Sequence, residues 1–424
     1  MINFYDHQKK ELNETSDLNK VAYFHDMGLG KTFTGAEKLK QLGASRNLVI
    51  CQKSKIDDWI DHFRKYYPTY HIFNLTKPKE FKAFEEIYSS NLLYIAIINY
   101  DLVFRRQLLL SIEDFTLLLD ESSVIQNETA KRSRFILNLN PKNIILLSGT
   151  PVGGKYERLW SQLHLLGWGI SKKLFYNQYV DFHYDDAEGF PIMVIDGYKN
   201  EDRLKQKMKK YGCRFLKSDE VFNLPKQIDQ NIFVNTSKEY KKFRKDAVVT
   251  FDDIELIGDT ALTKMLKERQ LCGQYSKEKI EAFQDLLEST SDRIIVFYNF
   301  WDELEKLCTI AGRLGRPISI INGQNKDLKA YNQCDDSVTF IQYQAGAMGL
   351  NLQLANKIIY FTPPLSSELF EQSKKRIHRI GQDKPCFYYY LKCKNSIEDR
   401  IYATLAKRRD YTEFLFEKES CTEA

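Results

Sequence analysis

The feature that most constrains the fold is a series of short, continuously apolar runs that alternate with segments of helical period. Strands that are apolar on both faces are typically covered by helices on both sides, as in a parallel sheet. The runs lie in two sets: Val21–Phe24, Leu48–Cys51, Leu92–Ile98, Thr116–Leu119 and Ile144–Ser148, then Ile294–Phe297, Ile318–Ile321, Val338–Ile341, Ile358–Phe361 and Phe387–Leu391. The pattern predicts an α/β protein with two lobes, each a parallel sheet flanked by helices.

The section between the two sets has a different character. From about Trp160 to Glu288 the chain is lysine-rich and mainly helical in period, and Leu224-Pro225 predicts a break within it. We therefore predict a first lobe with a helical protrusion over residues 1–225, a helical linker over 226–288, and a second lobe over 289–424 that ends in a brace helix. The helical insertions would lie between the two sheets.

Composition excludes several classes of protein. With 28% charged and 13% aromatic residues, the 424-residue chain is not expected to be disordered. Its longest apolar run, Leu92–Ile98, is far below the ~20 residues that cross a bilayer, so no membrane partner is expected. The eight cysteines form no CxxC pair, which argues against a zinc site or a disulfide framework and favours a reducing, cytoplasmic compartment. A net charge of +5 permits a nucleic-acid partner without requiring one.

The sharpest local motif follows the first apolar run and opens a helical segment; it consists of Met27, Gly28, Leu29, Gly30, Lys31 and Thr32. In a P-loop the glycines let backbone N–H groups surround phosphates, the lysine contacts the β and γ phosphates, and the threonine hydroxyl binds Mg²⁺. The full spacing would place a small residue where this chain has His25. A glycine-rich turn without a ligand is the alternative. The motif predicts ATP and Mg²⁺ as cofactors.

Two adjacent carboxylates, Asp120 and Glu121, end the run that begins at Thr116. Open α/β sheets bind ligands at the carboxyl edge of their strands, so the pair would face the nucleotide. We predict that Asp120 holds the Mg²⁺ shell and that Glu121 orients and deprotonates the attacking water. An Asp-Glu pair after a strand is on its own a solvated turn, and the P-loop upstream is what favours catalysis.

A third motif, Ser148-Gly149-Thr150-Pro151, ends another apolar run. Alone it is an ordinary turn, and its order behind the first two motifs gives it weight.

A polar stretch over residues 372–382 contains Arg376 and Arg379. The two arginines are three positions apart, so on a helix they would project from one face. Two guanidiniums placed in this way suit a γ-phosphate whose charge grows in the transition state. The alternative is a solvated basic helix end.

Taken in order, these motifs resemble those of the superfamily 2 helicases and, within them, the SWI/SNF-type DNA translocases. Other segments match that branch: Gln8, Ile50–Ser54 with Trp59, Asn99-Tyr100, Leu159-Trp160, Phe215–Asp219, Leu224-Pro225, Gly349–Gln353 and Arg376–Gln382. Three segments depart from it. Ser122-Ser123 replaces Ala-His, Gln342–Gln344 replaces Thr-Arg, and Val152–Gly154 replaces Ile-Gln-Asn.

The resemblance implies two RecA-like lobes with ATP in the cleft between them. Gln8 would read the adenine edge with its amide, and Gly349 would join the P-loop in binding the nucleotide. Arg376 and Arg379 would reach the nucleotide when the cleft closes, and hydrolysis would open it again.

The resemblance also implies that DNA, double-stranded in the first hypothesis, lies across both lobes. The expected contacts are Lys53, Ser54, Asn99, Tyr100, Tyr343 and Gln344. The basic segment Arg203–Lys217 is either a solvated helix face or a further phosphate contact. The aromatic run Phe387–Tyr390 is interpreted as a buried strand rather than a surface for base stacking.

Three functions fit these motifs. The first is an ATPase that moves on double-stranded DNA, and the second is a strand-separating helicase on DNA or RNA. The third is a DNA-binding scaffold that has lost turnover, which the Ser122-Ser123 change motivates. Because little chain follows residue 382, we expect a compact, monomeric bacterial or phage motor that a separate protein directs to its target.

Overall fold

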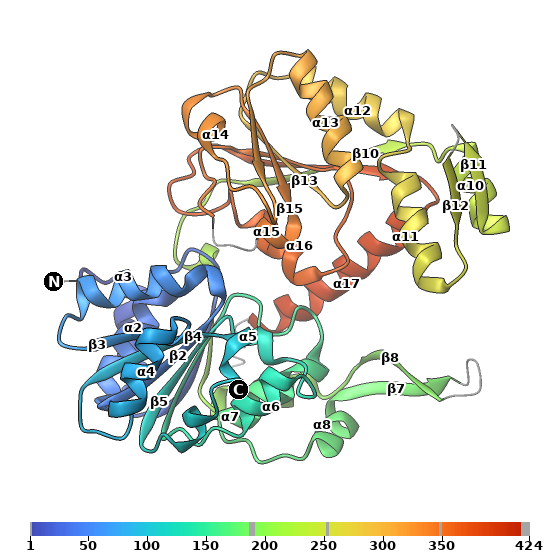
Figure 1. Ribbon diagram of the computed structural model, residues 1–424. Helices are drawn as coiled ribbons and strands as arrows, with labels where there is room; N and C mark the ends of the chain where they lie inside the picture. The colour runs from blue at the N-terminus through green and yellow to red at the C-terminus, as the bar shows by residue number, and fades with distance from the viewer. Residues whose placement is uncertain (1, 186–190, 252–253, 347–349, 417–424) are drawn as a thin grey trace, which may run out of the picture. The chain divides into compact units, whose positions relative to one another are not determined.

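The computed structural model describes residues 2–185, 191–251, 254–346 and 350–416. The chain divides into two compact units, the first formed by Met1–Val221 together with the described residues from Tyr411 on, and the second by Phe222–Asp410 (Figure 1). In the described ranges no helix combines the length and the apolar character that a bilayer span requires.

The first unit is built on a parallel sheet. Within the described residues this sheet has seven strands in the order β3-β4-β2-β5-β6-β1-β9. The strands are β1 (Lys20–His25), β2 (Arg46–Cys51), β3 (His71–Asn74), β4 (Tyr94–Asn99), β5 (Phe115–Asp120), β6 (Asn143–Ser148) and β9 (Cys213–Leu216). All neighbours pair in parallel, so the carboxyl ends of the strands lie along one edge. The five apolar runs predicted for this lobe are strands β1, β2, β4, β5 and β6.

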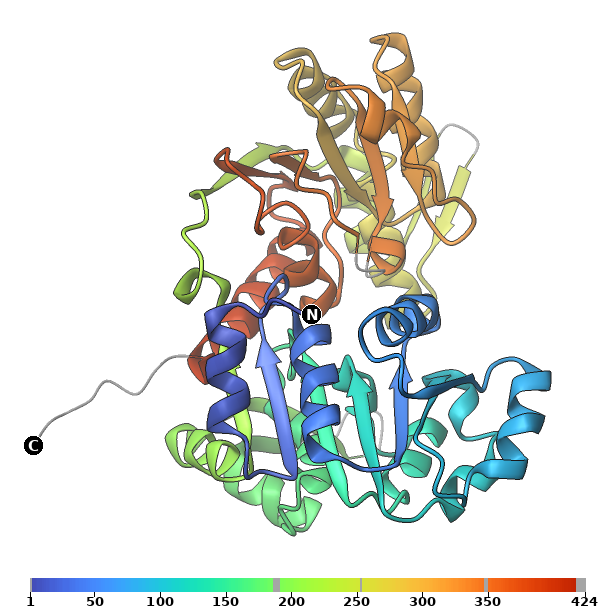
Figure 2. The ribbon, with the colours of Figure 1, turned by 90° about the vertical axis from the view of Figure 1, so that its left-hand side faces the viewer.

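Helices cover both faces of this sheet, as its continuously apolar strands require. Val21 and Tyr23 pack in one cluster with Leu39 of α2, whereas Ala22 and Phe24 belong to the cluster on the other face. Helices α1 and α2 lie side by side (Figure 2). The helices of this unit are α1 (Asp6–Glu14), α2 (Lys31–Leu42), α3 (Ile56–Tyr66), α4 (Pro78–Ile87), α5 (Tyr100–Val103), α6 (Lys131–Leu137), α7 (Trp160–Leu165), α8 (Lys172–Tyr179) and α9 (Glu201–Lys210).

The second unit repeats this plan. In the part of the chain that the structure describes, its parallel sheet has six strands in the order β10-β17-β16-β13-β15-β14. They are β10 (Gln227–Val234), β13 (Ile294–Tyr298), β14 (Ile318–Ile321), β15 (Val338–Gln342), β16 (Lys357–Tyr360) and β17 (Cys386–Cys393). The second set of apolar runs therefore gives strands β13 to β17, and the prediction of two RecA-like α/β lobes is confirmed.

Both faces of the second sheet are covered as well. Ile295 and Phe297 pack with Phe370 of α16 and Ile401 of α17, whereas Val296 packs on the other face with α12 and α13. The helices are α10 (Lys238–Asp246), α11 (Ala261–Cys272), α12 (Lys277–Glu288), α13 (Trp301–Arg313), α14 (Lys329–Gln333), α15 (Tyr343–Gly346), α16 (Ser367–Lys374) and α17 (Ile397–Phe416).

The middle section contains more strands than its helical period predicts. Strands β7 (Val180–Asp185) and β8 (Ile192–Tyr198) form one antiparallel hairpin, and β11 (Val248–Phe251) and β12 (Ile254–Ile257) form another. In β7 the rings of Phe182 and Tyr184 lie 5.8 Å apart on one face, alternating with His183. This period of two is the signature of a strand rather than a helix.

The basic segment Arg203–Lys217 forms α9 and then strand β9. Leu204 and Met208 are fully buried in the core of the first unit. Its apolar stripe therefore anchors the helix.

Candidate functional site

The loop between β1 and α2 has the backbone of a phosphate-binding turn. Gly28 and Gly30 have φ angles of 91° and 72°, in the left-handed region that favours glycine. Gly30 is the N-cap of the 12-residue helix α2, so the first backbone N–H groups of that helix lie at this turn. The Nζ of Lys31, in the first turn of α2, donates to the carbonyl oxygens of His25 at 2.8 Å and Asp26 at 3.1 Å. Amide donors and an ammonium group, the partners that phosphates require, are thus gathered in one loop.

His25 shows how this loop tolerates a large residue at its first position. Its ring is fully buried, 5.3 Å from the ring of Tyr23, and its Nε2 lies 3.7 Å from the carboxylate of Glu11. Burial lowers the pKa of the imidazole. The ring thus lies beside Glu11 of α1, while the backbone carbonyl of His25 accepts from Lys31.

Gln8 contacts the same loop from α1. Its Nε2 donates to the carbonyl oxygens of Leu29 and Gly30, both at 3.3 Å, and its Oε1 accepts from the backbone N–H of Tyr5 at 3.0 Å. The side chain is only 3% exposed. In this conformation the amide nitrogen braces the P-loop while the amide oxygen caps the start of α1, which differs from the predicted contact with an adenine edge.

Asp120 is the last residue of β5, and Glu121 follows it with a left-handed φ of 55°. Asp120 Oδ2 accepts a hydrogen bond from Trp59 Nε1 at 2.8 Å. Burial raises the pKa of Asp120, while the Trp59 bond and the charge of Lys31 oppose that change. Tyr100 donates through its hydroxyl to the carbonyl oxygen of Asp120 at 2.9 Å. Sequence reasoning missed both contacts, because neither spacing nor period signals them.

The first three motifs meet at the carboxyl ends of the adjacent strands β5, β6 and β1. Ser148 donates through Oγ to Glu121 Oε2 at 3.4 Å. A Cβ on Gly149 would lie 3.3 Å from Lys31 Nζ, so a side chain here would intrude beside the ammonium group. The buried hydroxyl of Thr150 has no hydrogen-bond partner among the described residues.

These residues fit a nucleotide with a divalent cation. The loop amides and Lys31 can hold phosphates, and the carboxylate of Asp120 with the hydroxyl of Thr32 provides the oxygen ligands that Mg²⁺ prefers. Met27 and Leu29 flank Gly28 in the loop between β1 and α2.

The predicted nucleic-acid contacts of the first unit fall into two groups. Lys53 and Ser54 are exposed in a short 3-10 helix, η1 (Lys53–Lys55), that follows β2. Asn99 ends β4 and Tyr100 begins α5, and they are only 7% and 3% exposed. The role predicted for the Tyr100 side chain needs correction, because its hydroxyl supports the carboxylate segment.

In the second unit, Tyr343 and Gln344 begin α15 directly after β15. The ring of Tyr343 is buried and stacked on Phe297 at 5.0 Å, and its hydroxyl donates to the carbonyl oxygen of Thr362 at 2.8 Å. Its side chain is therefore part of the core rather than a surface contact, whereas Gln344 is exposed. Gly349 lies outside the described residues.

The helical arrangement predicted for Arg376 and Arg379 is wrong, because α16 ends at Lys374. The backbone instead bonds to another segment: the carbonyl oxygen of Arg376 accepts from Leu352 N–H at 3.1 Å. Arg376 is 2% exposed and its Nη1 contacts the carbonyl oxygen of Leu350 at 3.4 Å. Arg379 is partly exposed and donates to the side chain of Asn351.

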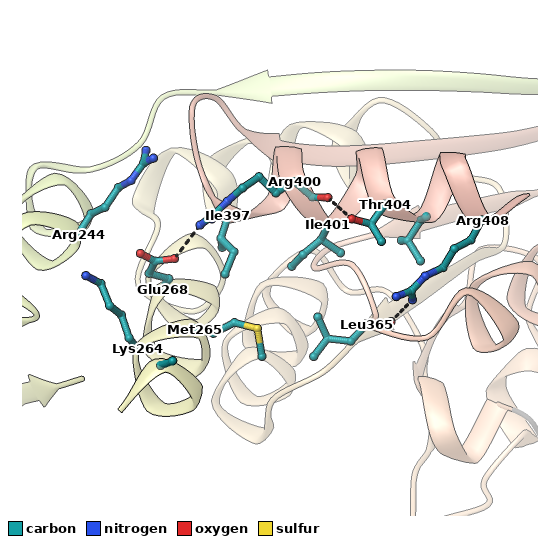
Figure 3. A pocket seen from close by; sticks show the side chains of 12 residues that line it. Arg244, Lys264, Met265, Glu268, Leu365, Ile397, Arg400, Ile401, Thr404 and Arg408 are labelled. Atoms are coloured by element: carbon teal, nitrogen blue, oxygen red, sulfur yellow. Dashed lines mark hydrogen bonds and ion pairs between the residues drawn. The ribbon is translucent and has the colours of Figure 1, made fainter. Parts of the chain in front are cut away.

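A cavity of about 670 Å³ lies within the second unit among α10, α11 and α17 (Figure 3). Four cationic side chains line it, those of Arg244, Lys264, Arg400 and Arg408, and Arg400 pairs with Glu268 at 3.6 Å. The predicted site residues are not part of its lining.

Cys272, Cys393 and Glu398 form a buried cluster, with one ligand atom of each within 4.8 Å of the others. The carboxylate of Glu398 is already paired with Lys279 Nζ at 2.6 Å, and both side chains are at most 1% exposed. When both thiols are protonated, the charges of Glu398 and Lys279 cancel, so no unpaired charge is buried in the cluster. The spacing of the cysteines in the sequence gave no sign of this proximity.

Family comparisons match most of the chain. The SNF2-related domain matches residues 12–286, and the helicase conserved C-terminal domain matches residues 278–381. A mouse protein, the SWI/SNF-related matrix-associated actin-dependent regulator of chromatin subfamily A member 1, is 23% identical over 89% of this chain and 39% of its own length. An uncharacterized ATP-dependent helicase of Mycoplasma genitalium is 24% identical over 89% of this chain and 38% of its own length.

The chain thus spans about two fifths of the length of these curated relatives. Among solved structures, the Sulfolobus solfataricus SWI2/SNF2 ATPase core in complex with double-stranded DNA aligns with 97% of this chain and 92% of its own. The sequence identity of that pair is 19% and the TM-score is 0.47.

Proposed function

This chain belongs to the SNF2-related family of ATP-dependent helicase and translocase motors, and on that premise we propose that it hydrolyses ATP to move along double-stranded DNA. The observation that carries the proposal is the meeting of three motifs at one edge of the first sheet. Lys31, Glu121 and Ser148 come from three adjacent strand ends, and Ser148 bonds directly to the Glu121 carboxylate. Such an edge is where open α/β sheets bind ligands.

The proposed roles follow from the donor and acceptor groups of these residues. The P-loop amides and Lys31 bind the phosphates, and Thr32 and Asp120 hold the metal. Bound Mg²⁺ would offset the negative charge of the phosphates. Glu121 accepts the proton of the attacking water, and Ser148 orients its carboxylate.

The two arginines of the second unit receive different roles. Arg379, which is partly exposed, is proposed to stabilise the charge that develops on the γ-phosphate. Arg376 is buried and contacts the backbone at Leu350 and Leu352. It is therefore proposed to hold the segment around Leu350 and Leu352 in place. Substitution of Arg379 would then reduce turnover with less loss of stability than substitution of Arg376.

Lys53, Ser54 and Gln344 are the predicted DNA contacts with exposed side chains, and they follow strands β2 and β15. We propose that they contact the sugar-phosphate backbone, which carries no sequence information. We also propose that a separate protein directs the motor to its target.

The test is phosphate release measured in parallel without nucleic acid, with single-stranded DNA, with duplex DNA and with RNA. We expect duplex DNA to stimulate release, and Lys31→Ala and Glu121→Gln to abolish it. Lys40→Ala is the matched control, because Lys40 lies on the same helix with its side chain 57% exposed. Displacement of a triplex-forming strand would then report translocation. A rate of hydrolysis that does not change when nucleic acid is added would refute the proposal. Separation of the two strands of a duplex would favour the helicase alternative.

A further inference from the structure

Ser122 directly follows the two carboxylates and begins the short 3-10 helix η3 (Ser122–Ile125). Its side chain is fully buried, and its Oγ donates to Gln162 Oε1 at 2.7 Å. Gln162 lies on α7 and is also fully buried. Its Nε2 donates to the carbonyl oxygen of Pro151 at 2.8 Å. A buried amide therefore joins the end of β5 to the segment that follows β6.

These bonds close a circuit with the contacts described above. Ser148 Oγ donates to the Glu121 carboxylate at 3.4 Å and accepts from the backbone N–H of Thr150 at 3.2 Å. Thr150 precedes Pro151, and Glu121 precedes Ser122. The carboxylate segment and the Ser148–Pro151 segment are thus linked twice, once through Ser148 and once through Gln162.

The second link holds Ser122, and the residue before it, Glu121, is under backbone strain. Glu121 has φ 55° and ψ 59°, a conformation that a residue with a side chain adopts only when its surroundings enforce it. Ser122 is the next residue, and its hydroxyl is fixed to α7. Helix α7 is in turn anchored in the core through Leu163 and Leu165. A change at Pro151 would reach Glu121 through hydrogen bonds that have no solvent to replace them.

We propose that Ser122 and Gln162 are positioning residues that couple the placement of the Glu121 carboxylate to the conformation of the Ser148–Pro151 segment. This inference rests on the proposed ATPase function. It assigns a role to Ser122 and Gln162, to which the sequence motifs assigned none. The opposing view is that the bonds only satisfy two buried polar side chains. The two views differ in their expectation for turnover once stability has been restored.

The experiment compares Ser122→Ala, Gln162→Met and the double variant S122A/Q162M, with S122A/Q162L as a second apolar pair. Ser161→Ala is the matched control, because this buried serine adjoins Gln162 on α7 and its hydroxyl has no hydrogen-bond partner within the described residues. For each protein, the Tm is measured together with kcat and KM for ATP, with and without saturating duplex DNA.

Ser122→Ala leaves Oε1 of Gln162 unpaired, whereas Gln162→Met leaves both the Ser122 hydroxyl and the Pro151 carbonyl oxygen unpaired. Each should lower the Tm by about 5 °C or more, and the double variants, which leave only the Pro151 carbonyl oxygen without its donor, should recover part of the Tm that Gln162→Met loses. If the residues position Glu121, the DNA-stimulated kcat of the double variants stays about tenfold or more below wild type, while KM for ATP changes by less than about twofold. Ser161→Ala should match wild type in both measurements.

A double variant that is folded at the assay temperature and keeps the wild-type kcat would overturn the inference and leave the ATPase proposal standing. A wild-type chain that releases no phosphate under any condition would overturn the proposed function and, with it, this inference. A double variant that is folded at the assay temperature, with unchanged KM and reduced kcat, would support the inference.

Discussion

Glu303 makes the stability of the second unit depend on pH. It lies in the first turn of α13 with a fully buried side chain. Its Oε2 accepts three hydrogen bonds, from Asn299 N–H at 2.9 Å, Phe300 N–H at 3.1 Å and Thr362 Oγ1 at 3.0 Å. Its Oε1 is buried without a hydrogen-bond partner among the described residues. Burial raises the pKa of Glu303 from 4.5 to about 7, although the three bonds oppose that change.

The direction of the effect follows from proton linkage. In the folded protein Glu303 keeps its proton up to a pH of about 7, whereas in the unfolded chain it ionises near 4.5. The folded state therefore binds more protons between these values, and stability falls as the pH rises through them. At about 1.36 kcal/mol per pH unit, the loss between pH 5 and pH 8 is about 2.5 kcal/mol from this one side chain.

Glu303→Gln removes the titration while an amide oxygen can still accept the three bonds. From pH 5 to pH 8, we expect the free energy of opening of β13 and α13 to fall by about 2.5 kcal/mol more in wild type than in the variant. Hydrogen–deuterium exchange of the two proteins at matched pH measures this difference, because the intrinsic exchange rates cancel. Parallel pH dependence in both proteins would refute the reasoning.

Three further predictions concern single contacts. Trp59→Phe removes the hydrogen-bond donor to the Asp120 carboxylate and should lower kcat about tenfold or more. Phosphate release measured against Mg²⁺ concentration tests this, and an unchanged curve would count against the contact. Glu398→Gln leaves Lys279 buried without its partner and should cost about 3–5 kcal/mol in urea unfolding, whereas replacing both residues with apolar ones should recover most of it. Gly30→Ala would place a Cβ 2.4 Å from Gln8 Nε2 at a left-handed φ and should weaken ATP binding, measured with a fluorescent analogue; Gln8→Ala should relieve only the collision.

The central strands and the edge strand β14 could be predicted from the sequence, whereas the edge strands β3, β9 and β10 could not. Strands such as β4 are buried at every residue, so they appear as continuous apolar runs. Strands β3 and β10 lie at sheet edges and are each buried at only one residue, Asn74 and Val234, so they show no such run. Edge strands need apolar side chains on only part of their surface, and their sequences are correspondingly polar.

The candidate site could be predicted as far as the sheet determines it. Parallel strands deliver their carboxyl ends to one edge, so the meeting of Lys31, Glu121 and Ser148 follows from the order of the motifs. The supporting contact between Trp59 and Asp120 spans 61 positions and depends on how α3 packs, which local patterns do not encode. The turn that contains Arg376 and Arg379 could not be predicted either. After Lys374 the chain leaves the helix, and the carbonyl of Arg376 accepts a hydrogen bond from the distant Leu352.

The pairing of β10 with β17 has a consequence for synthesis of the chain. The two strands are in register from Gln227 opposite Cys386 to Val234 opposite Cys393. Strand β10 leaves the ribosome roughly 10 to 30 s before β17, its neighbour in the sheet, at ordinary rates of translation. The first sheet is complete once Leu216 has emerged, so the first unit can fold while the second still exposes unpaired strand edges. During synthesis, the nascent second unit is therefore the part of the chain in which an unpaired strand edge stays exposed longest.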